Sequence, residues 1–157
     1  MLSLAHALVA AKIAEATHDP ILSPILAFGS HFILDSIPHW DLGTNWRYRG
    51  KVKTGILAIT DTVVGFLLAF VLFQSSTPLF PLILSISASL LPDWMEAPWY
   101  IFWANKHAKI YGKYSSVWER IAHAIYLTES KFHKTVPLPF GLLTQIATVG
   151  FFLILLQ

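Results

Sequence analysis

The segment His31-Phe32-Ile33-Leu34-Asp35-Ser36-Ile37-Pro38-His39-Trp40-Asp41 ends a long apolar stretch with two imidazoles and two carboxylates. In a helix, His31 and Asp35 share one face, because residues four apart stack above one another. The proline of the segment bends or ends that helix, and His39 and Asp41 follow around it. Imidazoles and carboxylates are ligands of divalent metal ions, and burying them without partners is costly. The segment therefore predicts a helix that ends at a polar site able to bind metal.

The composition of the chain is typical of a membrane protein. Its 157 residues are enough for one domain, and we expect residues 1–157 to form a single membrane domain. Hydrophobic residues make up 55% of the chain and charged residues 13%, against about 25% charged in soluble domains. The mean hydropathy is +0.57. The sequence has no cysteine, so a metal site in it must use His, Asp, Glu or water.

Apolar segments separated by polar turns predict an all-α fold with about five transmembrane helices. Three segments are long enough to span a bilayer, which takes about 20 residues. Two earlier, shorter segments are expected to form a tight hairpin around Asp19-Pro20 that also spans. Apolar residues at three- and four-residue steps predict one further, amphipathic helix at the cytoplasmic surface. The expected spans are about 2–16, 21–37, 54–73, 79–103 and 138–156, and the amphipathic helix is about 116–133.

The basic residues predict the orientation of this bundle. Ten of the eleven Lys and Arg residues fall into two stretches that an even number of crossings separates. The side that carries them is expected to be cytoplasmic, because Lys and Arg are enriched in cytoplasmic loops. The chain is then a multi-pass protein of the cell (inner) membrane, with its N-terminus in the cytoplasm and its C-terminus outside. The first stretch contains Arg47, Arg49, Lys51 and Lys53, and the second contains Lys106, Lys109, Lys113, Arg120, Lys131 and Lys134.

Five ionisable residues of the apolar segments lie at a similar depth. Counted from the outer turns at 1.5 Å per residue, His6, His31, Asp35, Asp61 and Asp93 all lie roughly 16–23 Å away. They come from four separate helices. Ionisable groups at such depth are costly and mark functional sites. We therefore expect these side chains to converge near the cytoplasmic face.

Further candidates come from neighbouring positions. His133 precedes the last span at the cytoplasmic face and can reach the same layer. Glu129, one helical turn before His133, has the spacing of an ordinary solvated surface pair. Glu96 shares a helical face with Asp93 and is a candidate base or a partner of the ligands. Asp41 is expected to orient a ligating histidine or to join the ligands directly.

The 31–41 segment resembles the signature of the bacterial predicted membrane-bound metal-dependent hydrolases. This family includes the LexA-regulated inner-membrane proteins and is distantly similar to zinc-dependent phospholipase C. Its members are small multi-helix membrane proteins, and the matching positions here are His6, the 31–41 segment, Pro92-Asp93 and His133. Two positions differ: many relatives have Thr where this chain has Ala5, and paired histidines where it has His133 alone. The resemblance implies a metal site built from these residues and a hydrolase activity.

These residues predict metal-dependent hydrolysis. One or two divalent ions, Zn²⁺ or alternatively Mn²⁺, Mg²⁺ or Fe²⁺, would supply a nucleophile from water near neutral pH. The expected substrate is a phosphoester of a lipid or lipid-linked molecule, which the surrounding basic residues would attract. Membrane lipid, and not nucleic acid, is therefore the expected partner. The expected metal ligands are His6, His31, Asp35, His39, Asp61, Asp93 and His133, with Asp41 and Glu96 as candidate catalytic residues.

Two other functions remain open on the sequence. An ion or proton carrier would also place His and Asp in membrane helices, but it needs a polar path to the outer face, where this chain has few polar groups. A structural or partner-binding membrane protein would use the same cluster to hold its bundle together. The motifs G-x-S-x-G, H-E-x-x-H and the P-loop do not occur in the chain, so serine hydrolase, zincin and nucleotidase functions lack support.

Overall fold

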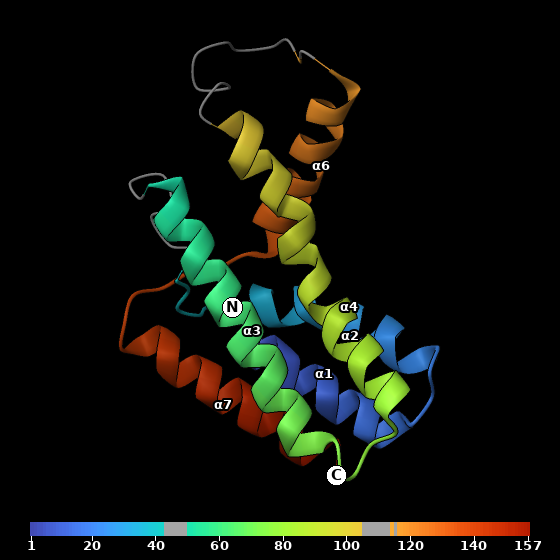
Figure 1. Cartoon of the computed structure of the whole chain (residues 1–157). Helices are drawn as coiled ribbons and strands as arrows, with labels where there is room; N and C mark the ends of the chain where they lie inside the picture. The colour runs from blue at the N-terminus through green and yellow to red at the C-terminus, as the bar shows by residue number, and fades with distance from the viewer. Residues whose placement is uncertain (43–49, 105–113, 115) are drawn as a thin grey trace.

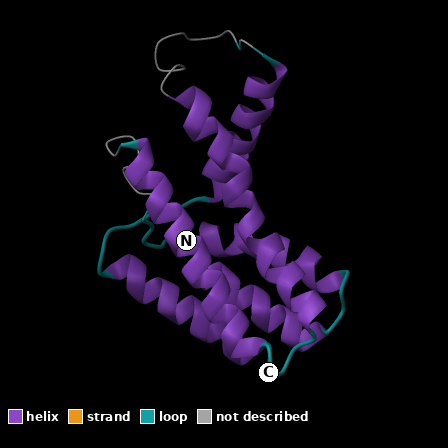
Figure 2. Cartoon of the chain, in the orientation of Figure 1, coloured by secondary structure: helices purple, strands orange, loops and turns teal. Residues whose placement is uncertain are grey.

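The computed structural model describes residues 1–42, 50–104, 114 and 116–157 as an assembly of helices (Figures 1 and 2). Within these residues there is no β-strand, and one isolated β-bridge joins His39 to Thr135. The prediction of an all-α fold is therefore confirmed. The helices are α1 (Ser3–Thr17), α2 (Leu22–Ser36), α3 (Lys51–Phe73), α4 (Leu79–Pro98), η2 (Trp99–Trp103), α6 (Val117–Phe132) and α7 (Phe140–Leu155).

Each expected helical segment corresponds to a helix of the structure. The expected span at 79–103 is α4 continued directly by the π-helical turn η2. The turn at Asp19-Pro20 forms as expected, because the Asp19 carboxylate accepts the backbone N–H groups of Ile21 and Leu22, each at 2.8 Å. Five basic residues used to predict the orientation lie outside the described residues: Arg47, Arg49, Lys106, Lys109 and Lys113.

Helix α1 lies at the centre of the bundle and packs against α2, α3, α4 and α7. Its alanines let these neighbours approach closely, because a methyl side chain keeps two helix backbones near each other. Ala7 and Ala11 join one buried cluster with residues of α3 and α4, while Ala5, Val9 and Ile13 join a second cluster that reaches α2. The sequence of α1 is therefore that of a helix buried all around, and not of one with a single apolar stripe.

Glycine allows the closest of these approaches. A Cβ atom at Gly65 of α3 would lie 2.7 Å from the backbone nitrogen of Leu4, so only glycine lets α3 cross the first turn of α1 at this distance. At the start of α7, a Cβ at Gly141 would overlap with the backbone of Trp40. Both glycines hold a helix against the polar end of the bundle.

The segment after α2 is held in place by the segment after α6. The backbone N–H of His39 donates to the carbonyl of Lys134 at 3.0 Å, and the N–H of Val136 donates to the carbonyl of His39 at 2.8 Å. From α7, the Gln145 side chain donates to the carbonyl of Trp40. These bonds bring two segments almost a hundred residues apart in sequence to the same place.

Helix α6 forms where expected, but its apolar face is turned outward. Its start is capped by Ser116, whose hydroxyl accepts the N–H of Glu119 at 3.1 Å. The buried residues of α6 are Glu119, Ala122 and Glu129, whereas Val117 and Ile121 of the expected apolar face are exposed. The helix therefore packs on the bundle through its more polar side.

The lengths of the helices bear on the expected membrane spans. Among the described helices, α3 is the one long and apolar enough to cross a membrane, and α7 is apolar but shorter. Helices α1 and α2 have 15 residues each, which corresponds to about 22 Å, less than the roughly 30 Å of a hydrocarbon core. By length and composition, one of the five expected spans qualifies.

Candidate metal centre

Three groups of His, Asp and Glu side chains lie side by side where α1, α2, α4 and α6 meet. Within each group, one possible ligand atom per residue lies within 4.8 Å of the others. His31 and Asp35 each belong to two groups, so the three groups form one continuous site. Buried His, Asp and Glu residues in this arrangement can hold a metal ion. The groups are His6, His31 and Asp93; Asp35, His39 and His133; and His31, Asp35 and Glu129.

His31 points one ring nitrogen at three carboxylates. Its Nδ1 lies 2.8 Å from the carbonyl oxygen of Ser89, which can only accept, so Nδ1 carries the proton and donates it there. The opposite nitrogen, Nε2, lies 3.5 Å from Asp35, 3.7 Å from Asp93 and 3.6 Å from Glu129. An imidazole fixed in this way by a backbone carbonyl is the usual state of a metal-ligating histidine.

His39 is fixed by the same kind of bond. Its Nδ1 donates to the carbonyl of Ile37 at 2.7 Å, which leaves Nε2 unprotonated. This Nε2 lies 3.8 Å from Asp35 and 3.4 Å from Nε2 of His133. Burial, together with the nearby amino-terminal ammonium, lowers the pKa of His39 to about 4, so its imidazole is neutral near pH 7. A neutral imidazole is the form that binds a metal.

His133 closes the site from the end of α6. Its Nδ1 lies 3.3 Å from Asp35 and its Nε2 lies 3.3 Å from Asp41. Burial alone would lower the pKa of His133, but hydrogen bonds to these two carboxylates outweigh burial and raise the pKa to about 10. His133 is therefore a cation near pH 7 beside two anions, and a metal ion bound to it would have to displace its proton.

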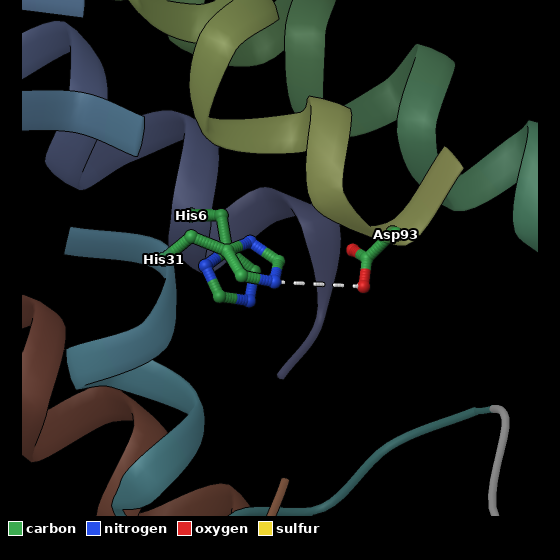
Figure 3. Close-up of side chains that lie close together, drawn as sticks. All are labelled: His6, His31 and Asp93. Atoms are coloured by element: carbon green, nitrogen blue, oxygen red, sulfur yellow. Dashed lines mark ion pairs between the residues drawn. The ribbon is translucent and has the colours of Figure 1, made fainter. Parts of the chain in front are cut away.

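His6 of α1 lies against His31. The two rings are stacked with their centroids 4.2 Å apart, and Asp93 approaches from α4 (Figure 3). Nε2 of His6 lies 3.1 Å from Asp35, which also accepts the amino group of Met1. Asp35 thus contacts groups from the start of α1, from the segment after α2 and from the end of α6, and it lies at the centre of the site.

Buried nitrogen atoms without partners test whether a metal fits. Among the described residues, Nδ1 of His6 and Nε2 of His31 are buried and form no hydrogen bond. Nε2 of His31 also faces carboxylate oxygens, and this arrangement is favourable when a proton lies on Nε2 or a metal ion lies between the two partners. The donor set of imidazoles and carboxylates is suited to a borderline or hard divalent ion. These residues therefore fit a divalent metal.

Asp61 is the expected ligand that the structure does not bring into these groups. Its carboxylate accepts the backbone N–H of Ser3 at 2.8 Å, in the first turn of α1. The first N–H groups of a helix have no partner within it and attract a carboxylate. Counting along the sequence placed Asp61 at the right depth, but it could not show that the start of α1 lies in between.

Glu129 is the residue that sequence reasoning missed. It is 5% exposed, and its carboxylate lies beside Nε2 of His31. The sequence places Glu129 one helical turn before His133, a spacing that predicts a solvated surface pair. The interpretation fails because α6 packs through its polar side.

The two candidate catalytic residues lie beside these ligands. Asp41 contacts His133, and both Asp41 and Glu96 line a cavity of about 690 Å³ that also reaches Asp61, Asp93 and His133. Glu96 is buried, at 8% exposure. The cavity therefore connects the ligand groups to two further carboxyl groups.

Searches of the chain against protein-family models, curated proteins and solved structures find no match. A function must therefore be argued from the geometry of the site.

Proposed function

We propose that this protein is a membrane-embedded metal-dependent hydrolase that cleaves a phosphoester of a lipid or lipid-linked substrate at the cytoplasmic face. The observation that carries the proposal is the state of His31 and His39. Each donates Nδ1–H to a backbone carbonyl and points Nε2 toward carboxylates. Nε2 is therefore the one nitrogen of each ring that can bind a metal, and it lies beside carboxylate oxygens that can share the same ion.

The ligand groups form two neighbouring sets that a third group connects. His6, His31 and Asp93 on one side, and Asp35, His39 and His133 on the other, would hold one or two ions, and Glu129 lies with His31 and Asp35 between them. Zn²⁺ suits the mixture of imidazole and carboxylate, with Mn²⁺, Mg²⁺ or Fe²⁺ as alternatives. A bound ion of this kind supplies Lewis acidity and a water nucleophile near neutral pH.

Asp41 and Glu96 are the groups that we propose for proton transfer. Asp41 holds His133 through its Nε2 at 3.3 Å and lies at the edge of the cavity, where it can orient that imidazole. Glu96 lies on α4 one turn from Asp93 and faces the same cavity. A carboxyl group that lines the cavity beside the ligands can take a proton from water or return one to the leaving group.

Exposed apolar side chains on the helices support the proposal that the protein lies in a membrane. Helix α3 carries exposed apolar side chains along its whole length, and α6 turns its apolar face outward. Large exposed apolar surfaces are typical of contact with lipid or partners, and the basic residues favour the cytoplasm for the end that bears the site. The exposed apolar side chains of α3 include Val52, Ile56, Ile59, Val63, Leu67 and Val71.

Metal analysis of the purified protein tests the proposal. We expect stoichiometric divalent metal in the wild type, and less than one-tenth of it in His31→Ala and His39→Ala, because loss of one ligand opens the site. His18→Asn is the matched control: it removes an exposed imidazole far from the site, and asparagine tolerates the left-handed backbone of residue 18 (φ 54°). Hydrolysis of a panel of phospholipids, followed by the alcohol and phosphomonoester products, should follow the metal content. A metal-free wild type, or hydrolysis indifferent to a chelator, contradicts the proposal.

A further inference from the structure

The cavity beside the metal centre lies between two helices that separate from each other. Helices α3 and α4 lie close together at one end and diverge toward the end that carries α6 (Figure 1). Two hydrogen bonds cross the cavity from α3, one to α4 and one to η2, which continues α4. Nε1–H of Trp94 donates to the hydroxyl of Thr62 at 3.3 Å, and Nζ of Lys51 donates to the carbonyl of Ile101 at 2.5 Å. From Lys51 to Thr62 the wall formed by α3 is about 16 Å long, at 1.5 Å per residue.

The cavity is polar on one side and apolar on the other. Its polar side is formed by residues of the metal centre, among them Asp41, Asp93 and His133. The walls are formed by aliphatic side chains of the two diverging helices, such as Leu57 of α3 and Ala97 of α4. A ligand that fills this space must therefore carry an ionic group and an apolar group a short distance apart.

The apolar wall continues to the outside of the molecule. Three of the lining residues have large side chains that are also exposed at the surface: Ile59 by 53%, Trp94 by 41% and Ile101 by 52%. The outer sides of α3 and α4 next to them carry further exposed apolar residues, such as Ile56 and Met95. An alkyl chain can thus pass from the cavity to the surface without leaving apolar contacts.

We propose that the ligand of this cavity is a single membrane amphiphile, bound with its phosphoester at the polar side and its alkyl chain leaving sideways between α3 and α4. This assignment rests on the proposed function, and it names the route and the contacts of the substrate. A small water-soluble phosphoester would contact the polar side alone and leave the aliphatic walls uncovered.

Gly55 provides a means of testing this assignment. It lines the cavity from α3, and a Cβ atom built on it meets nothing within 4 Å. A leucine at this position therefore enters the space of the proposed chain without disturbing the backbone, and it also favours the helix. Gly150 of α7 is the matched control, because it is also helical, also free of neighbours within 4 Å, and does not line this cavity.

The experiment measures binding of two probes that cannot be hydrolysed, hexadecylphosphonate and ethylphosphonate, to the zinc-loaded protein in detergent micelles by calorimetry. We expect hexadecylphosphonate to bind more tightly than ethylphosphonate, because only the long probe contacts the apolar walls as well as the polar side of the cavity. Gly55→Leu should weaken binding of the long probe about tenfold and leave the short probe unchanged. Gly150→Leu should change neither affinity, and neither variant should alter the zinc content.

The possible failures are distinguishable. Equal affinity for both probes, or equal effects of Gly55→Leu and Gly150→Leu on the long probe, overturns the lateral route, even if the protein binds zinc and hydrolyses p-nitrophenyl phosphate. Chain-dependent binding that Gly55→Leu abolishes supports the route, even if hydrolysis is never found and the proposed function itself fails.

Discussion

At the scale of the residue, the position of a proton decides what the histidines can do. His31 and His39 each bond a backbone carbonyl through Nδ1, so each has only one nitrogen left for a metal. His133 instead lies between the carboxylates of Asp35 and Asp41. Glu129 adds a further carboxylate next to His31. Histidine and carboxylate side chains of this site can thus serve as metal ligand, orienting group or counter-ion, according to their nearest neighbours.

Asp61 should behave as a helix cap and not as a metal ligand. Asp61→Asn retains an oxygen that can accept the N–H of Ser3, so we expect metal content and stability close to wild type. Asp61→Ala removes this acceptor and should lower the free energy of unfolding by about 1 kcal/mol while metal is retained. Metal analysis and denaturant unfolding in detergent measure both quantities. Loss of metal in Asp61→Asn at unchanged stability would show instead that Asp61 is a ligand.

At the scale of the element, close packing brings the ligands together. Helix α1 is rich in alanine and contacts four other helices, so the His6 side chain that it carries is held among ligands from its neighbours. The β-bridge between His39 and Thr135 holds together the segments that follow α2 and α6. Helix α6 completes the site because it packs through Glu119, Ala122 and Glu129. Contacts between helices and between loop segments therefore place these side chains next to one another.

Gly65 should be the most sensitive glycine of the bundle. Gly65→Ala places a methyl group against the backbone of Leu4, and we expect it to lower the free energy of unfolding by about 1–3 kcal/mol. Gly29→Ala in α2 is the control, because a Cβ there meets nothing within 4 Å, and the higher helix propensity of alanine should leave stability equal or slightly higher. Equal unfolding curves for the two variants would be inconsistent with a tight crossing of α1 and α3.

At the scale of the whole molecule, one end of the helical bundle gathers the ionisable groups while apolar side chains cover much of the surface. The carboxylates and imidazoles of the site come from α1, α2, α4 and α6 together with the segment after α2. Asp35 pairs with the Met1 amino group, His6 and His133, while one buried ring nitrogen each of His6 and His31 forms no hydrogen bond. A divalent ion bound to those nitrogens and the neighbouring carboxylates would add contacts that hold the elements together.

Removal of metal should therefore loosen the entire bundle. With free Zn²⁺ at a hundred times its Kd, binding stabilises the folded state by about 2.7 kcal/mol, and excess chelator should remove that stabilisation and lower Tm. Added Zn²⁺ should restore Tm, and Asp35→Asn, which alters the residue shared by two ligand groups, should respond to neither treatment. Thermal unfolding in detergent, followed by circular dichroism, measures this. A wild-type Tm that chelator and Zn²⁺ leave unchanged would exclude a structural contribution of the metal.

The sequence by itself determined the helices and the level of the polar residues along them. Apolar runs and turns such as Asp19-Pro20 are local signals, and the distance of a residue along a helix follows from counting at about 1.5 Å per residue. His6, His31, Asp35 and Asp93, which this counting places at a similar depth, lie in neighbouring groups of the structure. The six helical segments are also predicted from the sequence, because the ends of a helix depend on residues close to them.

Only the tertiary structure decided which face of each helix turns inward and which backbone lies next to each side chain. Glu129 belongs to the site because α6 packs through its polar side. Asp61 does not belong to the ligand groups, and its carboxylate instead accepts a backbone N–H at the start of α1. His39 meets His133 because two loop segments bond to each other. Counting residues gives the position of a side chain along the axis of its helix. The rotation of the helix about that axis, and the helix that packs against it, follow from contacts between segments distant in sequence. No local sequence pattern contains these contacts.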